Sequence, residues 1–372
     1  MEIPDKEVKL CSFHTRMSID GEILVASGTD KDRNIVLTTY KKDHINKFTL
    51  YNKTVLYSND YRDYNIQLSD DNKTLVLIID KSSNSTNTII TFKFDNGEWN
   101  QVNSFIEKYV SVNNRVTLSY DGEYLYSLNQ NNSRVFLVIY SRSNYTESKL
   151  DYWLFSKTVF IHGEDTSNSF SNIHVTKDCK HVTIAYFIKN KLGNNKLVCR
   201  NIYIDKLVIN NVCDILDMPS VGVRDLKVVF NLTSTRIMLY SDVYDYTTSK
   251  YVFTKYEILK PDYRSARHDS ILINEINSLH VDSDKSIKTD MFVSVDKSKV
   301  VLYNLTSNLI RSISYDFNKD PDRSVIDDKV INDMNIEKYL NFVSDGFLDT
   351  TGLPVLVNEK DSNKYNFMFI SK

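Results

Sequence analysis

Short segments rich in apolar and β-branched residues recur along the whole chain, and polar turn residues bound each of them. Residues 74–79 read Thr-Leu-Val-Leu-Ile-Ile, and residues 89–94 read Ile-Ile-Thr-Phe-Lys-Phe. Segments of this length and composition, with Asn, Asp and Ser nearby, are typical of β-strands rather than helices. Equivalent pairs are 22–27 with 35–40, 124–128 with 135–140, and 182–187 with 197–203. The pattern predicts an all-β chain.

A short phrase precedes each pair of predicted strands. It consists of an apolar residue, Ser or Thr, any residue, Asp, and a small or turn-forming residue. The phrase occurs at Met17–Gly21, Leu68–Asn72, Leu118–Gly122 and Val175–Cys179. Its recurrence about every 50 to 57 residues, with strands on both sides, is typical of β-propellers, in which one blade is one repeat.

Three later units fit the same plan with a less regular turn. Their second strands are predicted at 236–240, 291–295 and 353–357, and a third strand follows each of them. A blade therefore has four antiparallel strands, and the third often ends in Tyr or Phe. The predicted blade origins lie near residues 20, 71, 121, 178, 234, 284 and 345. The sequence predicts that residues 1–372 form a single seven-bladed β-propeller domain.

Blade packing explains why such a fold is stable. A four-stranded blade has two apolar faces, and each can be buried only against a neighbouring blade. Closing the ring removes the exposed ends of the array. Either Val8–Phe13 or the last strand, Tyr365–Ile370, could supply the closing strand, and the sequence does not distinguish them.

Three segments interrupt the repeat. Residues 141–149 form a polar loop, and residues 260–277 form a long excursion between blades. Apolar residues of the segment 325–342 recur at mostly helical intervals, which predicts a short amphipathic helix beside the last blade. They are Val325, Ile326, Val330, Met334, Tyr339 and Leu340. Because loops on a rigid scaffold carry variable function, we expect these segments to contact a partner.

The overall charge is close to neutral. Lys and Arg total 46 and Asp and Glu total 48, a formal net charge of -2, which provides no overall attraction to nucleic acid or to an anionic membrane. The chain has only 9 Gly and 5 Pro, so Asn, Asp and Ser must supply the turns, since Asn and Asp tolerate a left-handed backbone. The many Asn, Lys, Ile and Tyr residues suggest an AT-rich genome.

Cysteine usage and the N-terminal residues favour a reducing, intracellular location, in the cytoplasm or nucleus. The four cysteines, Cys11, Cys179, Cys199 and Cys213, form no CxxC motif and are too few for a disulfide framework. The first residues lack the apolar core of a signal peptide. No apolar run approaches the roughly 18 to 20 residues that a membrane-spanning helix needs.

The Ser-x-Asp-Gly turn followed by an apolar strand resembles the turn of WD40-type and related seven-bladed propellers. The resemblance covers most of the chain as blade rhythm, but the Gly-His and Trp-Asp pairs of WD40 repeats are absent. The two tryptophans, Trp99 and Trp153, are not at equivalent positions of the predicted blades. The resemblance implies a divergent WD40-like propeller, in a class that mostly provides scaffolds inside multiprotein complexes, and it carries no family-specific functional residues.

An acidic segment near residue 320 has the spacing of oxygen ligands for a hard cation. Asp316, Asn318, Asp320 and Asp322 fall at positions 1, 3, 5 and 7 of a calcium-type loop, and further oxygen donors follow at positions 9 and 12. Pro321 stands where Gly normally permits the sharp turn, and position 12 is Asp rather than Glu. The alternative is a polar turn between strands. The sequence predicts no cofactor.

Two further groups of residues suggest less specific chemistry. His174, Cys179 and His181 flank one turn and could converge on zinc, although a fourth ligand is missing. Between Lys177 and Tyr203, cations alternate with aromatic residues, as in sites for single-stranded nucleic acid. The alternative for that stretch is the solvent face of ordinary strands. The chain has neither a Gly-x-Ser-x-Gly elbow nor a phosphate-binding glycine loop.

The sequence therefore predicts a non-catalytic β-propeller scaffold that binds protein partners within a larger complex. An alternative of another class is a propeller hydrolase, resembling lactonases, with a metal in its central channel. A third possibility is an RNA-associated propeller. The fold alone does not choose among them, because propellers host many functions.

Overall fold

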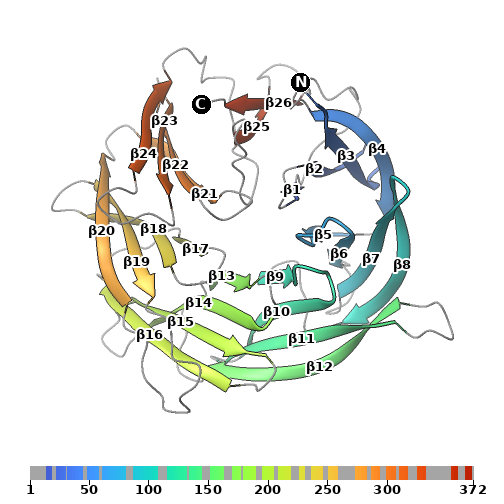
Figure 1. Ribbon diagram of the computed structural model, residues 1–372, viewed down its shortest axis with the longest axis horizontal. Coiled ribbons are helices and arrows are strands. Elements are labelled where there is room, and N and C mark those ends of the chain that lie inside the picture. Colours follow the sequence, from blue (N-terminus) through green and yellow to red (C-terminus); the bar gives the residue numbers. More distant parts are fainter. Residues whose placement is uncertain are drawn as a thin grey trace.

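The computed structural model consists of seven antiparallel sheets that follow one another around a ring (Figure 1). It describes residues 14–370, except for the segments given in the next sentence. These are residues 19–21, 31, 45–47, 58–60, 81–86, 108–114, 132–133, 145–150, 163–169, 177–178, 190–194, 205–207, 219–225, 231–235, 246–249, 259–272, 283–285, 294–298, 307–309, 317–324, 332–352 and 359–364. Every regular element among the described residues is a strand.

Each of the first six sheets has four strands, and we number these sheets as blades 1 to 6. Blade 1 contains β1 (His14–Met17), β2 (Ile23–Thr29), β3 (Ile35–Lys42) and β4 (Phe48–Tyr57). Blade 2 contains β5 (Asp63–Leu68), β6 (Thr74–Asp80), β7 (Asn87–Asp95) and β8 (Glu98–Glu107). Blade 3 contains β9 (Arg115–Leu118), β10 (Tyr124–Asn131), β11 (Arg134–Asn144) and β12 (Asp151–His162).

The later blades repeat this order. Blade 4 contains β13 (Phe170–Val175), β14 (His181–Lys189), β15 (Asn195–Tyr203) and β16 (Val208–Met218). Blade 5 contains β17 (Leu226–Phe230), β18 (Arg236–Asp245), β19 (Lys250–Ile258) and β20 (Ile273–Asp282). Blade 6 contains β21 (Ser286–Val293), β22 (Lys299–Thr306), β23 (Ile310–Asp316) and β24 (Val325–Ile331). The seventh sheet contains β25 (Leu353–Asn358) and β26 (Tyr365–Ile370).

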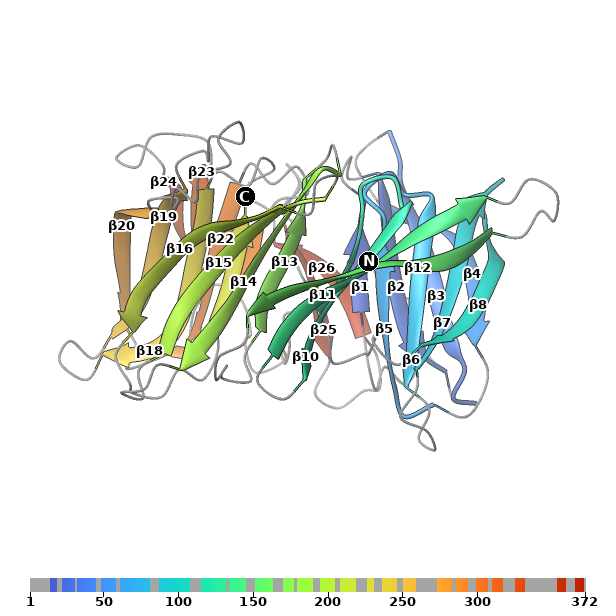
Figure 2. The same ribbon diagram turned by 90° about the horizontal axis from the view of Figure 1, so that it is seen from below.

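Within each blade the strands lie in chain order, with the first strand nearest the centre and the fourth on the outside (Figure 1). The first strands of consecutive blades contact one another from β1 to β21. Figure 2 shows that the strands run between the two faces of the ring. This arrangement is a β-propeller, and it confirms the fold class predicted from the sequence.

The core lies between the blades. One apolar cluster joins blades 1 and 2, a second joins blades 2 and 3, and a third joins blades 3 and 4. On β6, Leu75, Leu77 and Ile79 belong to the first cluster, whereas Val76 and Ile78 belong to the second, and all five are fully buried. Because a blade buries both faces, its central strands are continuously apolar instead of alternating.

A β-bulge recurs between the third and fourth strands, beside the aromatic residue that the sequence shows near the end of the third strand. The register shifts lie at Thr39/Tyr40, Thr91/Phe92, Ile139/Tyr140, Lys255/Tyr256 and Ser314/Tyr315. A bulge adds one residue to the outer strand, bends it and increases its twist. An outer strand that is bent in this way is a poorer template for edge-to-edge pairing with another chain.

The helix predicted over residues 325–342 is wrong for its first part, because Val325–Ile331 form strand β24. The bulge at Ser314/Tyr315 explains the error: it leaves Ile326 as the extra residue of β24 and so places two apolar residues in succession. That irregular spacing resembles a helical period. Residues 332–342 lie outside the described part of the chain.

The turn between the first two strands of the sixth blade lies later in the chain than the sequence suggested. The origin predicted near residue 284 falls between β20 and β21, which belong to different sheets. The connection from β21 to β22 instead spans 294–298, where the chain reads Ser-Val-Asp-Lys-Ser after Val293. The sixth blade therefore has the Ser-x-Asp phrase at the same place as the first four, and the sequence reading missed it.

Other boundaries differ in part from those predicted. Residues 141–144 continue β11, and residues 273–277 belong to β20, so these parts of the two predicted loops are strands. β26 pairs with β25 in a sheet that lies between blades 6 and 1 in Figure 1. Val8–Phe13 lie outside the described residues, so the identity of the closing strand stays a prediction.

Candidate functional site

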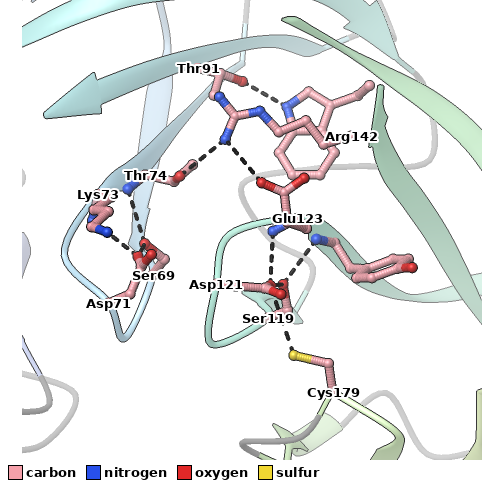
Figure 3. Close-up of polar contacts among 12 residues, drawn as sticks. Ser69, Asp71, Lys73, Thr74, Thr91, Ser119, Asp121, Glu123, Arg142 and Cys179 are labelled. Carbon is pink, nitrogen blue, oxygen red and sulfur yellow. Dashed lines mark hydrogen bonds and ion pairs between the residues drawn. The ribbon is translucent and has the colours of Figure 1, made fainter. Parts of the chain in front are cut away.

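The Ser-x-Asp phrase builds a closed hydrogen-bonded turn between the first two strands of a blade (Figure 3). In blade 3, the Ser119 hydroxyl donates to Asp121 Oδ1 at 2.6 Å and accepts the Tyr124 N–H at 2.9 Å. Asp121 Oδ1 also accepts the Glu123 N–H at 3.1 Å. The serine and the aspartate are both engaged with the turn itself, so the phrase is a structural device rather than a catalytic pair.

The blade 2 turn repeats this geometry. The Ser69 hydroxyl donates to Asp71 Oδ1 at 2.6 Å and accepts the Thr74 N–H at 3.0 Å. The Lys73 N–H donates to Asp71 Oδ1 at 3.0 Å. Ser and Asp recur at this spacing because a short side chain must reach the backbone at the far side of the turn.

The last residue of the phrase has a left-handed backbone in each turn where it is described. The φ angles are 64° at Asn72, 70° at Gly122 and 56° at Cys179. Gly and Asn are the residues that adopt this conformation most readily, whereas it is uncommon for Cys. The requirement explains why a small or turn-forming residue recurs there in the sequence.

We expect Ser119→Ala to lower the free energy of unfolding by about 1–3 kcal/mol, because Ser119 is fully buried and the Tyr124 N–H loses its acceptor. Urea denaturation followed by circular dichroism measures the change. Ser104→Ala, at an exposed serine on β8, is the matched control and should stay within about 0.5 kcal/mol of the wild type. Equal effects of the two substitutions would contradict this account of the turn.

The turns also join neighbouring blades. The Asp71 N–H of blade 2 donates to the Tyr120 carbonyl of blade 3 at 3.0 Å. Arg142 of β11, whose side chain is only 2% exposed, also lies between these two blades. Its Nη1 is 3.2 Å from Thr74 Oγ1 and 3.9 Å from Glu123 Oε1 (Figure 3). The Asp71–Tyr120 and Arg142–Thr74 bonds join blade 3 to blade 2 beside the apolar cluster, whereas Arg142 and Glu123 both belong to blade 3.

Trp99 and Trp153 occupy equivalent positions in blades 2 and 3, so the prediction that their positions differ is wrong. Trp99 on β8 pairs with Phe94, and Trp153 on β12 pairs with Arg142. Phe94 and Arg142 are equivalent because their backbone N–H groups donate to matching carbonyls of their own blades. Phe94 donates to Lys73 and Arg142 to Glu123, and each acceptor lies two residues after the aspartate of its turn. The connection before β8 is a two-residue hairpin, whereas β11 and β12 are separated by residues 145–150. That difference in length hides the equivalence in the sequence.

Each indole bonds to a threonine of the preceding blade. Trp99 Nε1 donates to Thr39 Oγ1 at 3.0 Å, and Trp153 Nε1 donates to Thr91 Oγ1 at 2.7 Å. Thr39 of β3 and Thr91 of β7 each come directly before the aromatic residue that lies opposite the bulge, so they too are equivalent. The Trp–Thr hydrogen bond is therefore a repeated link between neighbouring blades, and both of its residues are buried.

The structure does not bring the three proposed zinc ligands together. Cys179 Sγ lies 3.8 Å from Asp121 Oδ1 of the preceding blade, and burial and this carboxylate raise the pKa of its thiol. The His181 ring packs on Tyr203 at 5.0 Å, while His174 is buried on β13. Within the described part of the chain no three His, Cys, Asp or Glu side chains are grouped as a metal site.

The calcium-type loop is placed only at its first residue. Asp316 is the last residue of β23 and pairs with Lys299 of β22. Asn318, Asp320 and Asp322 lie outside the described residues, so this site stays a prediction. In the basic and aromatic stretch, Lys180 is exposed while Arg200 and Tyr203 are half-buried, and most of the other side chains are outside the described set. Nucleic-acid binding also stays a prediction.

The outer strands of blades 1 to 3 expose apolar side chains at repeated positions. Val55 on β4, Ile106 on β8 and Phe160 on β12 are 54%, 68% and 55% exposed. They are equivalent because of their partners on the third strand. Each pairs with the third-strand residue that lies four positions before the aromatic residue at the bulge. Leu50 and Phe155, which pair with that aromatic residue in blades 1 and 3, are also about half exposed. We call these five residues the rim belt.

The three strands that carry the rim belt are consecutive along the outer edge of the ring (Figure 1). β4 contacts β8, and β8 contacts β12. Single exposed apolar residues are ordinary on a protein surface, but here they recur at one structural position in three adjacent blades. Larger exposed apolar surfaces mark sites of interaction. Sequence reasoning missed the belt, because the bulges disturb the alternation that would have revealed it.

Comparisons with known proteins find the fold and no family. No protein-family model matches the chain, and no curated protein sequence matches it. The β-propeller domain of Cps50 (Swd1) from Myceliophteria thermophila is 9% identical, with a TM-score of 0.53 and coverage of 96% of each chain. The periplasmic gluconolactonase of Pseudomonas aeruginosa is 10% identical, with a TM-score of 0.52 and coverage of 96% of this chain and 91% of the other.

Hydrazine synthase of Kuenenia stuttgartiensis is also similar, at 10% identity, with a TM-score of 0.54 and coverage of 99% of this chain and 97% of the other. At these identities the likeness shows the fold alone. This chain is thus a β-propeller. Among its described residues no helix is long and apolar enough to cross a membrane.

Proposed function

We propose that this protein is a non-catalytic scaffold that binds a protein partner through the rim belt. The observation that carries the proposal is the recurrence of Val55, Ile106 and Phe160 at one exposed position in three adjacent blades. Burying apolar side chains is the main source of affinity in protein association. The Ser-x-Asp turns support this proposal indirectly, since their polar groups are used within the scaffold.

The rim variant Val55→Thr/Ile106→Thr/Phe160→Thr tests the proposal, because Thr keeps a strand preference while removing apolar surface. We expect endogenous partners cross-linked to the tagged wild-type protein in cells to fall at least about tenfold in the rim variant, the equivalent of about 1.4 kcal/mol. Quantitative mass spectrometry of the recovered complexes measures this. The matched control, Thr49→Ser/Asn100→Ser/Thr158→Ser, changes exposed polar residues on the same three strands and should keep wild-type recovery.

Two outcomes would refute the proposal. The endogenous protein could run as a partner-free monomer under mild conditions. Alternatively, the rim variant could recover the same partners as the wild type while its unfolding transition is unchanged. Hydrolysis of a lactone by the purified protein, together with a stoichiometric bound metal, would instead favour the enzyme reading.

A further inference from the structure

The first strands of blades 1 to 4 alternate between polar and apolar residues, with Thr15 as the exception, unlike the continuously apolar β6. A polar residue stands two and four positions before the Ser or Thr of each turn phrase. The residues two positions before are Arg16, Gln67, Thr117 and His174. Those four positions before are His14, Asn65, Arg115 and Asn172. Between them, Ile66, Val116 and Ile173 are buried. Because successive strand residues point to opposite faces, the polar residues of each first strand share one face.

Strand register shows that the residues two positions before the phrase are structurally equivalent. Each pairs with the third residue of the second strand of its blade, and these partners are Val25, Val76, Tyr126 and Thr183. The first strands lie nearest the centre of the ring, and consecutive ones contact one another (Figure 1). Arg16, Gln67 and Thr117 are half-buried, so solvent reaches their side chains. We call Arg16, Gln67, Thr117 and His174 the inner arc.

The inner arc ends at blade 4. Register places Val229 of β17 and Phe292 of β21 at the equivalent positions in blades 5 and 6. Two residues earlier on these strands, Lys227 and Asp290 carry opposite charges. At this level the ring therefore has hydrogen-bonding residues in blades 1 to 4 and apolar residues in blades 5 and 6.

The charges around the inner arc favour an anion. On β1, β5, β9 and β13 the positions two and four before the phrase include Arg16 and Arg115 and no Asp or Glu. The acid on these strands, Asp63, stands at the far end of β5, and its Oδ1 accepts a backbone N–H at 2.8 Å. At the near end, the Asp71 and Asp121 carboxylates each accept two hydrogen bonds within their own turns. These positions thus carry an excess of cations, although the whole chain has a net charge of -2.

Arg16 and Gln67 supply donors on neighbouring strands. A guanidinium has five N–H groups in a planar fork that matches the oxygens of a carboxylate or a phosphate. Gln67 Nε2 donates to Asn65 Oδ1 at 3.3 Å with one of its two N–H groups. That contact orients the Gln67 amide and leaves its second N–H to donate to a ligand.

We infer that the inner arc is a binding site for an anionic ligand, whose carboxylate or phosphate oxygens accept hydrogen bonds from Arg16 and Gln67. A charged acceptor forms shorter and stronger hydrogen bonds with Arg than a neutral one does. The site is separate from the rim belt, which lies on the outer strands. The inference therefore goes beyond the proposed function and does not depend on it.

Isothermal titration calorimetry of the full-length protein tests the inference with inorganic pyrophosphate and citrate as probes. Pyrophosphate carries phosphate oxygens and citrate carries carboxylate oxygens, so the tighter of the two names the ligand class. We expect at least one of them to bind with a Kd below about 1 mM. Spermidine, a cation of similar size, should not bind. Anion binding should weaken as salt rises from about 0.05 M to about 0.5 M, because salt screens the charges.

Substitutions at the inner arc make the test specific. Arg16→Gln/Gln67→Leu should weaken binding of the anion at least about tenfold. Lys53→Gln/Gln101→Leu is the matched control, since it removes one cation and one amide at exposed positions of β4 and β8, and it should bind as the wild type does. If the inner-arc double variant does not fold, Arg16→Gln alone should weaken binding at least about fivefold. The rim variant should bind the anion normally.

Several outcomes would overturn the inference. They are a Kd above about 10 mM for both anions, equal binding by the wild type and Arg16→Gln, an equal loss of binding in Lys53→Gln/Gln101→Leu, and binding of spermidine in place of the anions. None of them bears on the rim belt, so the proposed function still stands or falls by the recovery of endogenous partners with the rim variant.

Discussion

Replacing Trp153 with Ala should destabilise the protein by about 3–5 kcal/mol, the range measured when large aromatic side chains are removed from cores. Trp153 is 7% exposed and lies in the apolar cluster with Val76 and Ile78, so its removal opens a cavity between blades 2 and 3. Its loss also leaves the buried Thr91 hydroxyl without its donor. Urea denaturation followed by tryptophan fluorescence and circular dichroism measures the loss.

A matched control lies two residues away on the same strand. Phe155 is 56% exposed, so Phe155→Ala should change the free energy of unfolding by less than about 1 kcal/mol. Trp153→Phe retains most of the apolar contact and isolates the indole bond, with an expected cost of about 1–3 kcal/mol. A loss below about 1 kcal/mol for Trp153→Ala would show that this link does not hold the blades together.

Replacing Gly122 with Ala should cost about 2–5 kcal/mol, because two penalties act together. The backbone φ of Gly122 is 70°, a left-handed conformation that costs an L-residue roughly 1–2 kcal/mol. An added Cβ would lie 2.5 Å from Thr74 Oγ1 and 2.6 Å from Thr74 Cβ, so blade 3 must move away from blade 2. Overpacking of this kind costs about 1–3 kcal/mol.

Gly97 provides the comparison for the second penalty. Its φ is 88°, but an added Cβ would meet the hydroxyl end of the Tyr51 side chain, at 2.6 Å. Tyr51 is 49% exposed and can turn away, whereas Thr74 is buried. Gly97→Ala should therefore be clearly less destabilising than Gly122→Ala in the same denaturation experiment. If the two variants are equally stable, the contact between the blade 3 turn and Thr74 is not tight.

The blade plan was readable from the sequence because its causes are local. Ser119 and Asp121 recur at a fixed spacing since a turn needs their short polar side chains, and Gly122 follows because the backbone there is left-handed. The continuous apolar run of β6 also follows from the fold, since both faces of a blade are buried. These signals predicted an all-β propeller, and the structure confirms it.

The errors in the prediction came from features that are not periodic along the chain. Ile326 is the extra residue of the bulge opposite Tyr315, so two apolar residues, Val325 and Ile326, follow each other in the sequence. Their spacing predicted a helix where strand β24 forms. Variable connections hid the equivalence of Trp99 and Trp153, which only the register of the outer strands reveals. Counting residues from the turn cannot detect either feature, because both depend on which residues pair across strands.

The sequence by itself therefore determined the strands, their turns and the blade repeat, because each depends on neighbouring residues and on the two-sided burial of a blade. Only the tertiary structure decided which side chains meet across blades, as in the Trp153–Thr91 bond, and which remain outside. The rim belt belongs to the second kind. Val55, Ile106 and Phe160 are ordinary strand residues in the sequence, and only the register of the outer strands and their burial show that they share one exposed position in three adjacent blades.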